Sequence, residues 1–190
     1  LPGLTKLAAV MHAGGAACVA QLGHAGPSQW KEIPEQPVAA SSLVGADNPQ
    51  PKYPQFRAIS ISEIQTIVEK FARGAERAKK AGFDGVEIHG AHNYLVNTFL
   101  SLAWNRRRDA YGCQDMESRT RFAVEIIRSI RNLVGPDFIV GVRMNGAEYG
   151  IKNGLTVPES REIARILQQA GASYLSVSAW GFGPYDRLCY

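Results

Sequence analysis

The segment that decides the fold is DGVEIHGAHNYLVNTFLSLAWNRRRDAYG, residues 84–112. Its apolar run over residues 85–88 is too short and too rich in β-branched side chains for a helix, so it predicts a buried strand. The run stops at His89, and His92 and Tyr94 follow directly. Two imidazoles and a phenol at the end of a predicted strand indicate a functional site.

The sequence before this strand predicts a long amphipathic helix. Ser60 and Glu63 have the spacing of a capping box, which marks the start of a helix. One apolar stripe then continues to Gly82, and its members are Ile64, Ile67, Val68, Phe71, Ala75 and Ala78. The helix therefore leads straight into the histidine-bearing strand.

Helices and strands alternate along the rest of the chain. Thr156 and Glu159 form a second capping box. Helices are predicted over residues 5–12, 60–82, 117–134 and 156–170, and strands over residues 17–22, 85–88, 138–144 and 174–178. About four short apolar strands that alternate with helices are typical of parallel βα units with right-handed crossovers. The predicted fold class is α/β.

The strand count predicts part of a barrel. A complete (β/α)8 TIM barrel has eight strands and about 250 residues, so this chain would supply a partial barrel, and a small open sheet is the alternative. Barrels place their active sites at the carboxyl ends of the strands. Polar residues lie at these ends: Gln21 and His24, His89 and His92, Arg143, and Ser176 and Ser178. We therefore expect one partial barrel over residues 1–190, without the first and last barrel strands.

Two segments are predicted to lack regular structure. Residues 23–58 contain six prolines and no sustained periodicity, which is a long excursion for a compact domain. We interpret this segment as an active-site loop that walls or covers the site. Residues 179–190 are predicted to be a loop as well.

The composition is that of an ordinary globular domain, with 45% hydrophobic residues, 20% charged residues and a net charge of +4. The one basic run, residues 105–109, is closed by an acid, so we expect no nucleic-acid partner. Cys18, Cys113 and Cys189 lack the close spacing of metal ligands and favour a reduced, cytoplasmic setting. No apolar stretch is long enough to span a membrane. We therefore expect neither a metal nor a membrane partner.

Five motifs together resemble the old yellow enzyme family of FMN-dependent barrel oxidoreductases. They are QLGHAG (21–26), FARGAERAKKAGFDGVEIHGAHNYL (71–95), NRRRDAYG (105–112), ESRTRFAVEIIRSIR (117–131) and VGVRM (140–144). QLGH alone is a weak signal, but its occurrence in order with the other motifs is specific. The resemblance covers nearly the whole chain and corresponds to the family's second helix through its sixth strand.

The resemblance implies roles for five residues. His89 and His92 match the pair that hydrogen-bonds the carbonyl oxygen of an α,β-unsaturated substrate, and Tyr94 matches the tyrosine that protonates its α-carbon. Gln21 matches the glutamine at the pyrimidine edge of FMN, and Arg143 matches the arginine beside flavin N1 and O2. The implied activity is an ene reductase that uses NADH or NADPH and FMN to reduce the C=C bond of an enone or enoate.

The sequence also departs from the family pattern. Asn93 replaces a usual glycine, which is a mild change because Asn tolerates left-handed backbone angles. Cys113 replaces another glycine and is expected to perturb the loop before the next helix. Residues 144–156, MNGAEYGIKNGLT, resemble the branch that contains enoate and 2,4-dienoyl-CoA reductases.

Each site residue taken alone has other interpretations. His89 and His92 are also compatible with half of a zinc site or with a structural pair. Tyr94 alone is more often a packed aromatic. Arg143 alone is also compatible with a structural ion pair to Glu148 or Asp84.

Two further functions stay open for the chain as a whole. The first is a truncated, flavin-free structural or self-associating fragment of such an enzyme, because half a barrel exposes strand edges that can pair with a second copy. The second is a binding domain for a phosphorylated ligand, although no glycine-rich phosphate motif supports it. We expect a homo-oligomer, and we expect weak or absent FMN binding by the 190 residues alone, because the strands that hold the phosphate are missing.

Overall fold

A computed structural model of the chain describes residues 1–30, 32–45, 48–49 and 55–182. The helices are α1 (Pro2–Ala13), α2 (Ile61–Lys80), α3 (Leu95–Leu100), α4 (Met116–Val134) and α5 (Val157–Gln169), and a short 3-10 helix, η1, spans Gly26–Ser28. The strands are β1 (Val19–Leu22), β2 (Val38–Ala39), β3 (Arg57–Ala58), β4 (Gly85–Gly90), β5 (Ile139–Tyr149) and β6 (Tyr174–Gly181). The predicted alternation of helices and strands is confirmed.

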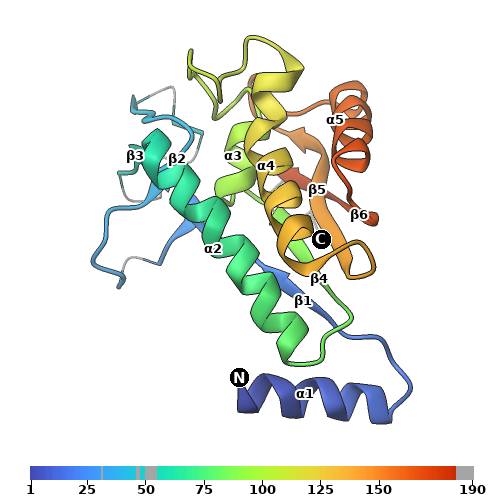
Figure 1. Ribbon diagram of the computed structural model, residues 1–190. Helices are drawn as coiled ribbons and strands as arrows, with labels where there is room; N and C mark the ends of the chain where they lie inside the picture. Colours follow the sequence, from blue (N-terminus) through green and yellow to red (C-terminus); the bar gives the residue numbers. More distant parts are fainter. Residues whose placement is uncertain (31, 46–47, 50–54, 183–190) are drawn as a thin grey trace.

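Within the described residues, the main sheet has four strands in the order β1-β4-β5-β6, and every neighbouring pair is parallel. The predicted α/β class is therefore correct. The register pairs Gln21 with Glu87 and His89 with Arg143, so the chain's polar side chains meet at one end of the sheet. Figure 1 shows α2 and α4 crossing in front of this sheet, with α5 beside them.

Side-chain caps fix where the long helices begin. Ser60 accepts a hydrogen bond from the backbone N–H of Glu63, and the Glu63 carboxylate accepts one from the backbone N–H of Ser60 at 2.9 Å. Thr156 and Glu159 form the same reciprocal box at the start of α5. Each box satisfies backbone donors that the first helical turn leaves unpaired. Both predicted capping boxes are confirmed.

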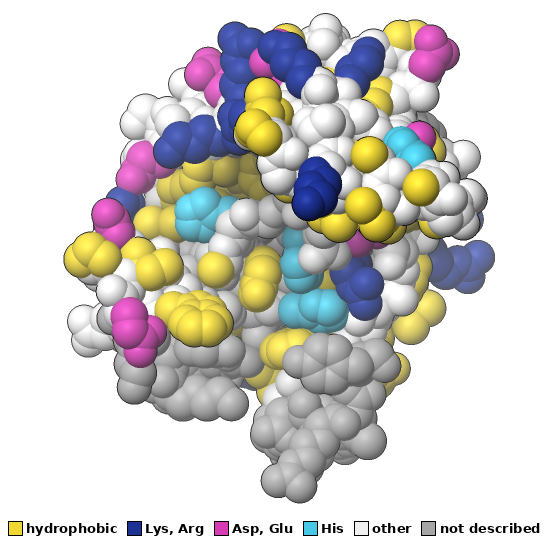
Figure 2. Space-filling model, turned by 90° about the horizontal axis from the view of Figure 1, so that it is seen from below, with side chains coloured by type: hydrophobic (Ala, Val, Ile, Leu, Met, Phe, Trp, Pro, Cys, Tyr) yellow, Lys and Arg dark blue, Asp and Glu magenta, His cyan; other side chains and the backbone are white. Residues whose placement is uncertain are grey.

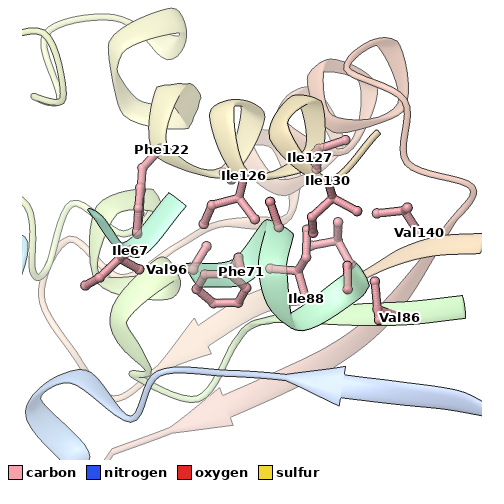
Figure 3. Packing of buried hydrophobic residues seen from close by; sticks show 14 of the residues in the cluster. Ile67, Phe71, Val86, Ile88, Val96, Phe122, Ile126, Ile127, Ile130 and Val140 are labelled. Atoms are coloured by element: carbon pink, nitrogen blue, oxygen red, sulfur yellow. The ribbon is translucent and has the colours of Figure 1, made fainter. Parts of the chain in front are cut away.

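The core lies between the helices and the outer face of the sheet, as Figure 3 shows. Successive side chains of a strand point to opposite faces, so Val86 and Ile88 of β4 are fully buried against the helices. Facing them are Ile67 and Phe71 of α2, and Phe122, Ile126, Ile127 and Ile130 of α4. The same alternation turns Glu87 and His89 to the inner face, where the polar residues gather.

The third and fourth strands of the main sheet are longer than predicted. β5 continues five residues beyond Met144, so Arg143 lies inside the strand and not at its end. β6 continues to Gly181, so the predicted loop is wrong for Ala179, Trp180 and Gly181. The reason is pairing between the two strands, which resumes after a register irregularity between Asn145 and Ala147. Residues 183–190 lie outside the described residues.

The predicted lack of regular structure over residues 23–58 is wrong for three short elements, since the segment contains η1, β2 and β3, and β2 pairs with β3 in a separate parallel sheet. Arg107 ties this segment to the domain, because its guanidinium donates to the backbone oxygens of Ala40 at 2.9 Å and Ile59 at 2.7 Å. The role of the segment as an active-site loop stays a prediction. None of the described helices combines the length and the apolar character that crossing a membrane requires.

Candidate functional site

All five predicted site residues line one hollow with a volume of about 480 Å³. They come from different parts of the chain, and the residues that complete the lining are Ser28 of η1 and Trp180 of β6. Figure 2 shows two adjacent histidine side chains beside a basic side chain on the face seen from below. Not every polar residue at a strand end joins them, since His24 lines a separate hollow of about 230 Å³.

The rings of His89, His92 and Tyr94 form a compact cluster. The centroids of the two imidazoles are 5.1 Å apart in an edge-to-face arrangement, and the Tyr94 ring stacks on His89 at 4.4 Å. Nδ1 of His89 accepts a hydrogen bond from the backbone N–H of Ala91 at 3.3 Å. Since this nitrogen is an acceptor, the neutral ring carries its proton on Nε2. Nε2 of His89 is then a hydrogen-bond donor.

Both imidazoles are neutral at pH 7. Burial lowers the pKa of His89 to about 4, and two charges act in the same direction, that of His92 when it is protonated and that of Arg143. Burial and the charge of Arg143 also lower the pKa of His92 below its usual value. A neutral imidazole has one N–H donor and one acceptor. The pair can therefore donate hydrogen bonds without adding charge to the hollow.

The His92 ring is held by residues of β6. Nε2 of His92 lies 2.7 Å from the hydroxyl oxygen of Ser178, and the ring packs against Trp180 with centroids 5.1 Å apart. The sequence places Ser178 at a strand end, but its bond to His92 spans 86 positions of the chain and has no local signal. Trp180 was missed because β6 is longer than its apolar run.

Glu87 fixes the orientation of Gln21. The Gln21 amide donates from Nε2 to Oε1 of Glu87 at 2.7 Å, and the hydroxyl of Tyr174 donates to the other carboxylate oxygen at 3.0 Å. Burial and this bond to Glu87 raise the pKa of Tyr174 to about 12. A carboxylate only accepts hydrogen bonds, so it sets which end of the Gln21 amide turns toward it. Sequence reasoning did not identify Glu87, since its partners lie on other strands.

Arg143 forms no ion pair within the described residues, and its Nε is buried without a hydrogen-bond partner. The two carboxylates considered as partners are engaged elsewhere. Asp84 accepts from the backbone N–H of Cys18 at 2.7 Å and contacts His12 at 2.8 Å, while Glu148 accepts from four other donors. The structural ion-pair interpretation is therefore wrong. A permanent cation with an unpaired buried donor suits an anionic or carbonyl ligand.

Among the residues with described positions, no group of three or more His, Cys, Asp or Glu side chains could hold a metal ion. Within the described residues, His89 and His92 therefore have no third side chain beside them that would complete a zinc site. The arrangement instead combines two neutral N–H donors, a phenol, an amide and a cation around one hollow. Such a set can bind a polar ring and stabilise negative charge on an oxygen.

The sequence profile of the NADH:flavin oxidoreductase / NADH oxidase family matches residues 1–179. The chain belongs to this family. Among the proteins that it resembles is an NADH oxidase of Thermoanaerobacter brockii, which is 42% identical over 99% of this chain and 28% of the relative. An NADPH dehydrogenase of Halalkalibacterium halodurans is 38% identical over 97% of this chain and 51% of the relative.

Solved structures of old yellow enzymes have the same fold. Morphinone reductase in complex with tetrahydroNAD matches with a TM-score of 0.78 and 31% identity, over 93% of this chain and 52% of that one. A 2-naphthoyl-CoA reductase complex matches with a TM-score of 0.83 and 29% identity, over 94% of this chain and 29% of that one. The family's TIM barrel confirms the predicted fold, and this chain corresponds to part of it. The chain spans about a quarter to a half of the length of these relatives.

Proposed function

We propose that the protein containing this chain is an FMN-dependent ene reductase, which uses NADH or NADPH to reduce the C=C bond of α,β-unsaturated carbonyl compounds. The observation that carries this proposal is the convergence of Gln21, His89, His92, Tyr94 and Arg143 on one hollow. Family membership supports the coarser activity, flavin oxidoreduction with a pyridine nucleotide.

The residues around the hollow fit a flavin. Gln21 and Arg143 would hold the pyrimidine edge of FMN, since an amide both donates and accepts, and the unpaired Nε of Arg143 is a donor that lacks a partner within the described chain. The fixed positive charge of Arg143 would favour an anionic ring system beside it. A reduced flavin supplies hydride when it is bound.

The imidazoles of His89 and His92 would bind the carbonyl oxygen of the substrate. Negative charge develops on this oxygen when hydride reaches the β-carbon, and preorganised N–H donors stabilise it. Nε2 of His89 carries the proton in the neutral ring, because Nδ1 accepts from Ala91. His92 would exchange its contact with the Ser178 hydroxyl for one with the substrate oxygen.

Tyr94 would deliver the proton that completes the reduction. Its ring lies against His89, so a substrate held by the imidazoles is adjacent to the phenol. A positioned phenol is a general acid when the acceptor carbon lies within hydrogen-bond reach. The α-carbon of the bound enolate is that acceptor.

The enoate or CoA-ester branch is the substrate class that we favour. Residues 144–156 resemble that branch, and one structural neighbour is a 2-naphthoyl-CoA reductase. Relatives named for NADH and for NADPH are both similar to this chain, so either nucleotide is compatible. A cytoplasmic homo-oligomer remains part of the proposal.

Titration with FMN of the purified protein that contains this chain, and not of the 190 residues alone, tests the cofactor site when it is followed by flavin fluorescence. We expect saturable quenching that Arg143→Met weakens by about tenfold to hundredfold, the equivalent of one charge-assisted hydrogen bond. Arg73→Met is the matched control, since Arg73 is exposed on α2 and pairs with Glu76. Equal affinity of the two variants would contradict the role of Arg143, and an absence of saturable quenching would contradict the flavin site.

A further inference from the structure

Glu148 is a buried carboxylate on β5, only 7% exposed, and it does not line the hollow. It accepts four hydrogen bonds: from Nδ2 of Asn97 at 3.0 Å, Nδ2 of Asn145 at 3.0 Å, the hydroxyl of Ser101 at 2.5 Å and the backbone N–H of Leu155 at 3.0 Å. Within the described residues, no Lys, Arg or His forms an ion pair with it. Burying a charged group costs free energy, and packing of a hydrophobic core does not require one. The four neutral donors around Glu148 therefore indicate a specific role.

The carboxylate of Glu148 orients two asparagine amides. Oε1 accepts from Nδ2 of both Asn97 and Asn145, and a carboxylate cannot donate, so the NH2 end of each amide must face it. The amide oxygens consequently point the other way. Oδ1 of Asn145 accepts from the backbone N–H of His92 at 3.3 Å, and Oδ1 of Asn97 accepts from the backbone N–H of Asn93 at 2.9 Å.

The two residues that these oxygens hold have an unusual backbone. His92 has φ of 56° and Asn93 has φ of 62°, both in the left-handed region. Two consecutive non-glycine residues in this region are strained, and such a conformation persists only when its surroundings over-determine it. The backbone at this point sets where the His92 ring lies relative to His89 and the hollow. The amide oxygens of Asn145 and Asn97 thus bind the backbone that places the His92 ring.

We propose that Glu148 is a positioning residue for His92, which acts by fixing the amides of Asn97 and Asn145 against the backbone N–H groups of His92 and Asn93. The catalytic consequence rests on the proposed function, since His92 is a substrate ligand only in that proposal. The positional claim stands on the hydrogen bonds alone. Glu148 is thus part of the site although it touches neither substrate nor cofactor.

Glu148→Gln tests the positional claim, because it keeps the side-chain shape and replaces one acceptor oxygen with an NH2 donor. The new NH2 group is disfavoured at the Oε2 position, where it would face the backbone N–H of Leu155, a donor that cannot reverse. It therefore faces the asparagines and forces at least one of their amides to reverse, which removes an acceptor from the strained backbone. By amide hydrogen exchange measured with NMR, we expect exchange at His92 and Asn93 to accelerate by about tenfold to hundredfold. The ring resonances of His92 should shift at the same time.

Glu159→Gln is the matched control, since Glu159 is a partly buried carboxylate of α5 that pairs with Arg119 at 2.6 Å. It should accelerate exchange at the start of α5 and leave the His92 ring resonances unchanged. Glu148→Gln combined with Asn145→Asp should restore slow exchange at His92, because the introduced carboxylate accepts from both the new amide and the His92 N–H. If Glu148→Gln does not fold, Asn145→Ala tests the positional claim in its place. This variant removes the acceptor of the His92 N–H, so exchange at His92 should accelerate.

The positional claim would be overturned if exchange at His92 and Asn93 rises no more than exchange in the neighbouring strands β4 and β5. A second experiment measures the kinetics of enone reduction by the protein loaded with FMN. Glu148→Gln should lower kcat/KM for an enone by about 100-fold, as a small misplacement of a binding group does, and the rescue variant should recover part of it. Accelerated exchange without enone reduction by the unmodified protein would refute the proposed function and leave the positional role of Glu148 in place.

Discussion

The low pKa of His89 predicts a loss of stability in mild acid. The folded chain holds this imidazole neutral down to about pH 4, whereas an unfolded chain protonates it near 6.5. Between these values the unfolded state binds more protons, so the free energy of unfolding falls as the pH decreases through this window. The contribution is fully present above pH 6.5 and lost by about pH 4.

The size of the effect follows from the displacement of the pKa. A displacement of about 2.5 pH units, at 1.36 kcal/mol per unit, corresponds to about 3 kcal/mol for a fully buried group. His89 is 9% exposed but lines the hollow, where solvent screens its charge, so this figure is an upper bound. Stabilising carboxylates lose their contribution at lower pH. Glu63, for example, has its pKa lowered to about 2 by its bonds to Arg57 and Ser60, and it titrates below its ordinary value of 4.5.

Urea unfolding at pH 7, 5.5 and 4.5, followed by far-UV circular dichroism, measures the effect against His89→Asn. The asparagine can accept from the Ala91 N–H in place of Nδ1 but has no proton to gain. His92 and His24 also have lowered pKa values and contribute to both proteins. We expect the unmodified chain to lose about 2 kcal/mol more than the variant between pH 7 and 4.5. Equal losses would refute the buried, neutral state of His89.

Three other substitutions have definite expected outcomes. Tyr94→Phe removes only the proton donor, so it should lower kcat for enone reduction by about 100-fold with little change in KM. Steady-state assays of the FMN-loaded protein measure this, and an unchanged kcat would exclude Tyr94 as the acid. Asn93→Gly should raise the urea midpoint by the equivalent of about 1 kcal/mol, because its buried side-chain amide has no hydrogen-bond partner among the described residues and its φ of 62° suits glycine. A lower midpoint would show that the amide has a stabilising partner. Ile126 is fully buried between α4 and the sheet, so Ile126→Ala should lower the free energy of unfolding by about 2–5 kcal/mol in urea. A loss below about 1 kcal/mol would contradict the close packing of this core.

The sequence was sufficient for those parts of the fold that local physics determines. Capping boxes at Ser60 and Thr156 fixed the starts of α2 and α5, because their hydrogen bonds join residues three apart. The far half of β5 could not be predicted, since Asn145 and Gly146 are typical of a turn and only pairing with β6 keeps them extended. The six-residue helix α3 is too short to show a helical period.

The site residues show the same difference between local signals in the sequence and contacts made only in the fold. His89, His92 and Tyr94 were found because they follow one strand directly in the sequence. Glu87 and Glu148 were not recognised as site residues, because Gln21 and Asn97, which they orient, lie 66 and 51 positions away and become their neighbours only through the sheet and α3. A sequence motif thus locates the groups that touch a ligand more readily than the buried carboxylates that aim them.

The most direct test of the proposed function is the visible absorption spectrum of the FMN-loaded protein during one anaerobic redox cycle. We predict that NADH or NADPH bleaches the flavin band, and that a stoichiometric addition of 2-cyclohexenone restores it. In the double variant His89→Asn and His92→Asn, the reduced nucleotide should still bleach the flavin band. The enone should restore that band much more slowly than in the unmodified protein. A band that bleaches and is not restored by any enone or enoyl thioester would contradict the assignment of this hollow as an ene-reductase site.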